Sequence, residues 1–209
     1  MMKKFLWLAV LALALPLATW ANSTQIVFQN TGGKMSSNGT TLKLSNSMLT
    51  SFTTVGGNTY TGNLGTVSFT TGPLTSGNLG VAGMFGSGGS FTIAGNGNNG
   101  IPAGVLFTGS FTGASWVGTF NPKGQHGLGN WTYVLTANVT GKLSNGTSAF
   151  GGTVQFTFDV PGSKQFGKGI SVRLNDGVTT VTVPEPGTLG LFGTGLLGLA
   201  GLIRRRFSA

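Results

Sequence analysis

Apolar and polar residues alternate with a period of two along much of this chain, and this pattern restricts the fold more than any other feature. The clearest example is segment 154–160, Val-Gln-Phe-Thr-Phe-Asp-Val. Successive side chains of a β-strand point to opposite faces, so the pattern predicts a strand with one buried and one polar face. Apolar residues at helical spacing are absent from this part of the sequence.

Alternation of the same kind recurs between turn sequences. The stronger predicted strands are 90–93, 104–112, 131–135 and 170–174, and the weaker ones are 25–29, 41–45, 66–70 and 115–120. Turns are predicted at Asn38-Gly39, Asn145-Gly146 and Asp176-Gly177, because these dipeptides accept the left-handed φ values of tight hairpins. The glycine-rich region 72–100 is the least regular part, and a long loop is compatible with it.

About ten short strands with one apolar face predict an all-β fold, and we expect an antiparallel β-sandwich or a jelly-roll-like domain. An outer-membrane barrel is the competing all-β interpretation. Most predicted strands are shorter than the roughly 9–11 residues that a membrane-spanning strand needs, which disfavours that barrel. The chain contains no Cys, so burial and β-pairing must hold the core together without disulfides.

The N-terminus has the layout of a secretory signal peptide. Lys3 and Lys4 precede an uncharged apolar segment, 5–15, and small residues at Thr19 and Ala21 fit a cleavage site. We therefore predict a signal peptide over residues 1–21, followed by an exported β-rich domain over residues 22–182.

The C-terminal tail, 183–209, contains three parts. Val183-Pro184-Glu185-Pro186-Gly187 comes first, an uncharged apolar run follows over 188–203, and Arg204-Arg205-Arg206 closes it. The run predicts a transmembrane helix, although its roughly 24 Å falls short of a bilayer core of roughly 30 Å. Arginines next to a span stay on the cytoplasmic side, which predicts that the preceding domain lies outside the cytoplasm.

The order of these three parts resembles the PEP-CTERM sorting signal, over about residues 183–206 only. The resemblance implies recognition and processing by a membrane enzyme, an exosortase, in a bacterium that secretes exopolysaccharide. It also implies that Pro184, Glu185 and Pro186 are recognition residues rather than catalytic ones. An ordinary C-terminal membrane anchor that happens to contain Pro-Glu-Pro is the alternative interpretation.

Charge gives little indication of a partner. Residues 22–183 contain seven Lys or Arg and two Asp, which gives a net charge of +5. These residues are scattered along the sequence, whereas a nucleic-acid surface needs clustered cations with stacking aromatic side chains. We therefore expect no nucleic-acid partner, while weak attraction to an acidic polysaccharide is compatible with the charge.

Candidate catalytic groups are few, and we expect no enzyme, metal site or cofactor. Gly95-Asn96-Gly97-Asn98-Asn99-Gly100 matches a dinucleotide-binding pattern, but a predicted strand follows it instead of the required helix. Asp159 and Asp176 are the only carboxylates of the predicted domain, and each has a structural explanation, in a strand and in a turn. His126 is the only histidine and has no acidic neighbour in the sequence.

Sugar binding needs only an aromatic side chain and polar neighbours, and Trp116 is the candidate for glycan contact. Trp131 and Tyr133 share a predicted strand face with Leu135 and are expected in the core. We expect an exported surface or matrix protein, tethered at the inner membrane as a precursor and then located at the cell surface or in a biofilm matrix. Its domain would be structural or adhesive. A carbohydrate-binding module for the matrix glycan is the alternative, and a secreted enzyme is third.

Overall fold

The computed structural model describes residues 24–123, 129–149 and 151–183, and within them the chain is all β, as the alternation predicts. The strands are β1 (Thr24–Thr31), β2 (Lys34–Ser37), β3 (Leu42–Thr53), β4 (Thr59–Thr71), β5 (Leu74–Gly77), β6 (Ala82–Phe85), β7 (Gly88–Asn96), β8 (Ala103–Asn121), β9 (Asn130–Leu143), β10 (Gly151–Pro161) and β11 (Ser171–Val183). These ranges include no helix long and apolar enough to cross a membrane. The predicted signal peptide and the predicted transmembrane helix lie outside them.

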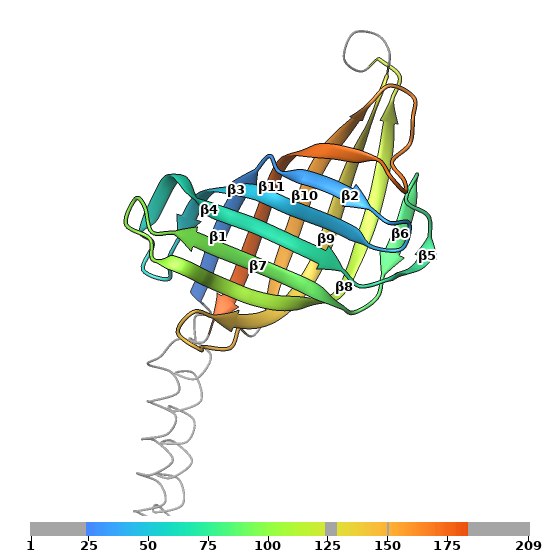
Figure 1. Ribbon diagram of the computed structural model, residues 1–209. Helices are drawn as coiled ribbons and strands as arrows, with labels where there is room; N and C mark the ends of the chain where they lie inside the picture. The colour runs from blue at the N-terminus through green and yellow to red at the C-terminus, as the bar shows by residue number, and fades with distance from the viewer. Residues whose placement is uncertain (1–23, 124–128, 150, 184–209) are drawn as a thin grey trace, which may run out of the picture. The chain divides into compact units, whose positions relative to one another are not determined.

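The strands form one closed antiparallel barrel with eight strand positions, and each position pairs with the one that follows it along the chain (Figure 1). Three of these positions hold a broken strand. The first consists of β1 and β2 and lies beside β3. The second consists of β4 and β5, and the third of β6 and β7. β8, β9, β10 and β11 complete the eight positions, and β11 pairs with β1 and β2 to close the ring. This is an up-and-down arrangement.

The closed barrel corrects the expected sandwich or jelly roll. Segments 104–112 and 115–120, predicted as two strands, belong to the single 19-residue strand β8. β9, β4 and β11 have 14, 13 and 13 residues, so the short strand lengths that were expected to disfavour an outer-membrane barrel are wrong. The predicted segments 131–135, 66–70 and 170–174 cover only one end of these strands, and Gly65 and Gly177 interrupt the alternation next to two of them.

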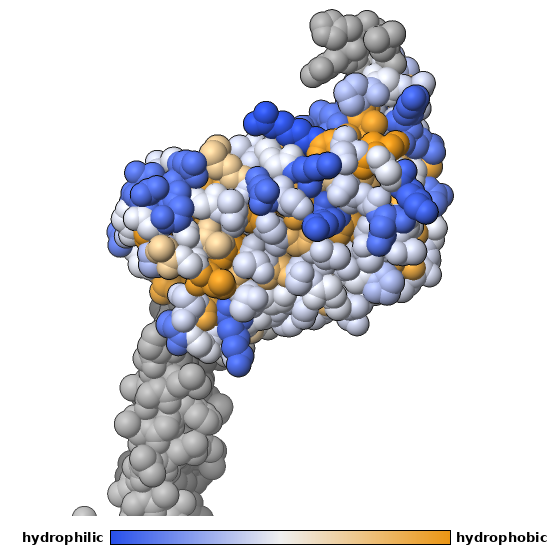
Figure 2. Space-filling model, viewed as in Figure 1, coloured by the Kyte–Doolittle hydropathy of each residue, from blue (hydrophilic) through white to orange (hydrophobic). Residues whose placement is uncertain are grey.

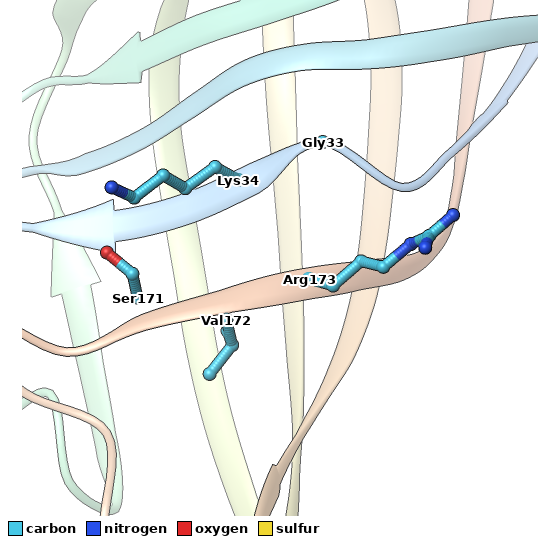
Figure 3. Close-up of a pocket in the computed structure, with 5 residues that line it drawn as sticks. All are labelled: Gly33, Lys34, Ser171, Val172 and Arg173. Atoms are coloured by element: carbon cyan, nitrogen blue, oxygen red, sulfur yellow. The ribbon is translucent and has the colours of Figure 1, made fainter.

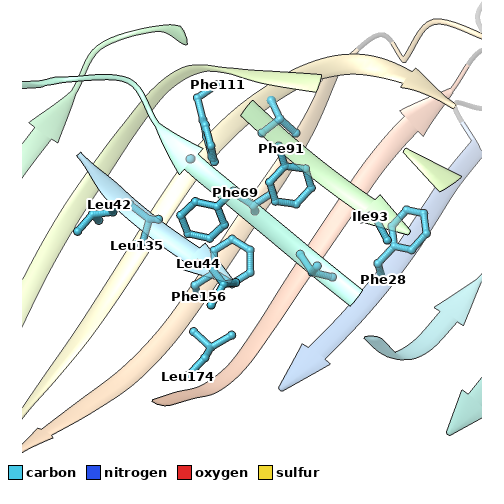
Figure 4. Packing of buried hydrophobic residues seen from close by; sticks show 14 of the residues in the cluster. Phe28, Leu42, Leu44, Phe69, Phe91, Ile93, Phe111, Leu135, Phe156 and Leu174 are labelled. Atoms are coloured by element: carbon cyan, nitrogen blue, oxygen red, sulfur yellow. The ribbon is translucent and has the colours of Figure 1, made fainter. Parts of the chain in front are cut away.

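The barrel interior is filled by large side chains. Phe69, Phe91, Phe111 and Phe156 form a central aromatic cluster, with the rings of Phe69 and Phe156 4.8 Å apart between centroids (Figure 4). Leucine, isoleucine and valine side chains from the surrounding strands cover this cluster. An eight-stranded barrel is just wide enough for inward side chains to fill it, and these aromatic residues supply the volume.

The outward positions of the long strands carry mostly threonine, serine, asparagine and glutamine. On β9, for example, Thr136, Asn138 and Thr140 alternate with the buried Leu135, Ala137 and Val139. In a barrel that spans a lipid bilayer the outward face carries an apolar band. The arrangement in this barrel is the reverse.

Two of the three predicted turns are confirmed. Gly39 and Gly146 have positive φ values of 104° and 81°, and they lie in the connections between β2 and β3 and between β9 and β10. The glycine-rich region 72–100 is not a long loop, since it contains β5, β6 and β7. Residues Gly95–Gly100 form the end of β7 and part of the turn into β8. The strand predicted after this glycine pattern is therefore present.

The turn predicted at Asp176-Gly177 is wrong, because β11 runs through both residues with a bulge at this point. Gly177 lies opposite Phe156, whose ring occupies the space that a Cβ atom would need. Such an atom would also lie 2.6 Å from Oδ1 of the buried Asn30. Glycine is required here for space inside the barrel, not for a left-handed backbone.

We expect Gly177→Ala to lower the free energy of unfolding by about 1–3 kcal/mol, because the added methyl group overpacks the interior against Phe156. Gly151→Ala is the matched control, since a Cβ atom at Gly151 meets no atom within 4 Å. Urea unfolding of the two full-length variants and the wild type measures the effect. Equal stability of the two variants would contradict this role of Gly177.

Candidate functional site

The two ends of the barrel differ in what they carry. Antiparallel pairing places Gln25 near Thr180 and Thr182, so β1 begins at the end where β11 finishes. Connections 54–58, 97–102 and 144–149 lie at this end, which we call the tail end. Connections 38–41, 78–81 and 162–170 lie at the opposite, far end.

Of the predicted sorting residues, only Val183 is among the described residues. It is the last residue of β11, and its side chain is buried in the core. Pro184, Glu185, Pro186, Gly187 and the arginines Arg204, Arg205 and Arg206 lie outside the described residues. Val183 thus belongs to the barrel, and Pro184 follows it directly in the sequence.

Trp116 does not offer a surface for a sugar. It points into the far half of the barrel, is 1% exposed, and packs between Tyr133, Phe158 and Phe166. Its Nε1 donates a hydrogen bond of 3.0 Å to the carbonyl oxygen of Leu79. Burial leaves neither ring face open to a glycan, so the loss of glycan affinity in Trp116→Ala would report a damaged fold.

Tyr133 connects the barrel wall to the segments that cover the far end. Its hydroxyl group donates a hydrogen bond of 2.8 Å to the carbonyl oxygen of Gly80 and accepts one of 2.9 Å from the backbone N–H of Phe166. Tyr133 and Leu135 are buried, as predicted, and Trp131 is partly exposed. The connections 78–81 and 162–170 are therefore both hydrogen-bonded to the same buried hydroxyl group.

Burial raises the pKa of Tyr133 from its ordinary value of 10.0, and the hydrogen bond from Phe166 opposes this shift. The raised pKa means that the folded protein favours the neutral phenol. The contribution of the neutral Tyr133 phenol to the stability of the folded protein is fully present below pH 10.0, and it is lost as the pH rises through the folded-state pKa.

Cationic side chains are concentrated on one part of the barrel. Lys34 of β2, Lys43 of β3, Lys168 of the 162–170 connection and Arg173 of β11 lie toward the far end. Backbone pairing across β11, β2 and β3 places Arg173, Lys34 and Ser45 in one row. It places Ser171, Ser36 and Lys43 in the next outward row. Hydrophilic side chains are seen over this region in Figure 2. We call Lys34, Lys43, Lys168 and Arg173 the cation cluster.

A shallow depression of about 370 Å³ lies within this surface, lined by Gly33, Lys34, Ser171, Val172 and Arg173. Figure 3 shows the side chains of Lys34 and Ser171 extending toward one side of it and that of Arg173 toward the other. All of these residues belong to β2, to β11 or to the turn before β2. The depression therefore exists only because β11 closes the barrel against β2.

The kink before β2 shapes this depression. Gly33 has a φ of +75°, and a Cβ atom there would lie 2.6 Å from the backbone nitrogen and Cα of Ser47. The strand can turn this sharply against β3 only because Gly33 has no side chain.

A second depression, of about 460 Å³, is lined mainly by outward threonines near the tail end. These include Thr112, Thr140, Thr153, Thr180 and Thr182. They offer hydroxyl groups but no charge, so this surface indicates no particular ligand chemistry.

The carboxylates considered for catalysis have structural partners or an exposed position. The two oxygens of Asp159 accept hydrogen bonds from Thr132 Oγ1 at 2.6 Å and from Asn175 Nδ2 at 2.9 Å. Asp176 is exposed on β11 beside Thr157. His126 lies outside the described residues.

The cation cluster cannot be recognised in the sequence alone, because its members are far apart in the chain. A partial indication was available, since a hairpin at Asn38-Gly39 pairs Ser36 with Lys43. Arg173 could not be added to them without knowing that β11 pairs with β2.

We expect Tyr133→Phe to lower the free energy of unfolding by about 1–3 kcal/mol, because the buried N–H of Phe166 loses its acceptor. Tyr60→Phe is the matched control, since Tyr60 lies at the tail end and stacks on Phe52. Urea unfolding near neutral pH measures both variants. A loss in Tyr60→Phe as large as that in Tyr133→Phe would contradict the assigned role.

The stability advantage of the wild type over Tyr133→Phe is expected to shrink as the pH rises above 10.0, because the unfolded phenol then ionises and the folded one does not. Unfolding midpoints of both proteins across this range measure it. The two proteins differ in no other side chain. An advantage that stays constant would show that burial of this hydroxyl group does not contribute.

Comparison with known proteins gives one match. The model of the PEP-CTERM protein-sorting motif matches residues 182–206, so its first two residues are also the last two of β11. Neither the curated proteins nor the solved structures contain a match to the chain. The chain therefore carries a PEP-CTERM protein-sorting motif, which implies export and membrane-associated sorting by an exosortase.

Proposed function

We propose that this protein is made as an inner-membrane-tethered precursor, sorted through its C-terminal tail, and delivered to the cell surface or the exopolysaccharide matrix. The motif match at residues 182–206 is the observation that carries the proposal. The signal peptide predicted over residues 1–21 agrees with it. The transmembrane helix, 188–203, would hold the precursor until the exosortase acts on the Pro-Glu-Pro sequence.

The barrel would serve as a structural or adhesive component of that matrix. Its long strands pair on both sides, and among the described strands only the short β5 has a single partner. Large aromatic and aliphatic side chains fill its interior. A domain of this kind keeps its shape without disulfides, which suits a building unit outside the cell.

A carbohydrate-binding module is the second candidate function, and the cation cluster is the observation that favours it. A glycan would be held on the outside of the barrel, since aromatic side chains occupy the interior. Catalysis is not part of the proposal. The hydrogen bonds from Thr132 and Asn175 give Asp159 a structural role.

The intact mass of the mature protein from the producing bacterium tests the sorting proposal. We expect a chain that begins near Asn22 and ends within or just after Pro184-Glu185-Pro186, with or without an added group at the new C-terminus. Cleavage there leaves Val183 in β11, so the barrel keeps its closing strand.

A variant with alanine in place of Pro184, Glu185 and Pro186 is the matched control, and we expect it to retain the complete tail in the membrane fraction. The presence of Arg204, Arg205 and Arg206 in all of the mature wild-type protein would contradict sorting. It would establish a permanent anchor instead.

A further inference from the structure

The strand register brings cations from β2, β3 and β11 onto one patch of the surface. Arg173 and Lys34 lie directly opposite each other on β11 and β2, and their side chains extend toward opposite sides of the depression. Lys43 lies one outward row away on β3, opposite Ser36. Like charges on one surface repel each other, and a bound anion lowers this repulsion.

The acidic residues among the described ranges do not neutralise the cluster. β2, β3 and residues 162–174 contain no Asp or Glu. Both oxygens of Asp159 are bound by Thr132 and Asn175. Asp176, on the same strand as Arg173, lies beyond the bulge and beside Thr157 of β10. The four cations are therefore available to an external anion.

The surroundings of the cations can bind oxygen-rich groups. Ser36, Ser45 and Ser171 occupy outward positions in the same rows, and their hydroxyl groups can donate or accept hydrogen bonds. The backbone N–H of Gly169 donates a hydrogen bond of 3.2 Å to the carbonyl oxygen of Ser37, which ties the segment carrying Lys168 to β2. The stem of Lys168 passes over Gly39, and a Cβ atom there would lie 3.5 Å from its Cδ.

We infer that the cation cluster is a binding site for a linear acidic polysaccharide, held by its carboxylate or sulfate groups. The inference deepens the second candidate function and rests on the proposed location outside the cell. Lys34 and Arg173, whose side chains extend toward opposite sides of the depression, each hold an acidic group of the polymer. Lys43 and Lys168 hold groups further along the polymer, and the serines bind sugar hydroxyls.

Other polyanions fit this surface less well. Single-stranded nucleic acid is bound by aromatic side chains on which its bases stack, and the paired outward rows of the cluster contain only Lys, Arg, Ser and Thr. A peripheral membrane site adds apolar side chains that enter the bilayer, whereas Met35 and Leu44, between these rows, point into the core.

The test measures binding of a soluble polyuronate to the full-length chain in non-ionic detergent at an ionic strength of about 0.15 M, where the Debye length is about 8 Å. We expect the double variant Lys34→Gln, Arg173→Gln to bind at least about tenfold more weakly, because two charge-assisted hydrogen bonds are lost. The matched control, Lys123→Gln with Lys142→Gln, removes the same net charge outside the cluster. It should change the affinity by less than about twofold, since net charge alone contributes little at a distance.

Three outcomes would overturn the inference. Equal weakening of binding in the two double variants would show that only net charge matters. Tight binding of neutral dextran would exclude recognition of charge. Stronger binding of duplex DNA or anionic vesicles than of polyuronate would indicate another partner. The exchange Lys34→Arg with Arg173→Lys guards against misfolding, because it keeps both charges and should keep binding. Polyuronate binding does not depend on processing of the tail. The sorting proposal is tested separately, by the intact mass of the mature protein.

Discussion

The pairing of β11 with β1 and β2 is the constraint on which the rest of this structure depends. It converts a meander of long strands into a closed ring in which each long strand is paired on both sides. Closure also fixes the interior volume, which Phe69, Phe91, Phe111 and Phe156 fill. A strand that failed to close would expose both a sheet edge and this aromatic core to water.

The same pairing connects the sorting tail to the barrel. Val183 contributes to the core and is followed immediately by the Pro-Glu-Pro sequence. Because proline cannot donate a backbone hydrogen bond, Pro184 is a suitable place for the strand to end. Processing beyond Val183 would therefore separate the predicted membrane segment from the barrel without removing any of the closing strand.

Closure has a third consequence at the far end. It brings Arg173 opposite Lys34, and so creates a surface of like charges that no single hairpin contains. The far end is also where Tyr133 holds the covering connections through Gly80 and Phe166. The barrel thus has a charged, covered far end and a tail end from which the sorting motif begins. This division fits a domain that is processed at one end and binds its surroundings near the other.

The sequence by itself determined the all-β class, the inward positions of Tyr133, Leu135 and Phe156, and the sorting motif. Each of these depends on residues close together in the chain, through period-two alternation or a contiguous pattern. Only the tertiary structure decided that the sheet is a closed barrel, that Trp116 is buried, and that Gly177 makes room for Phe156. The cation cluster belongs to the same group. Alternation specifies which face of a strand is buried, but it does not specify the neighbouring strand, and contacts between the first and last strands follow from ring closure alone.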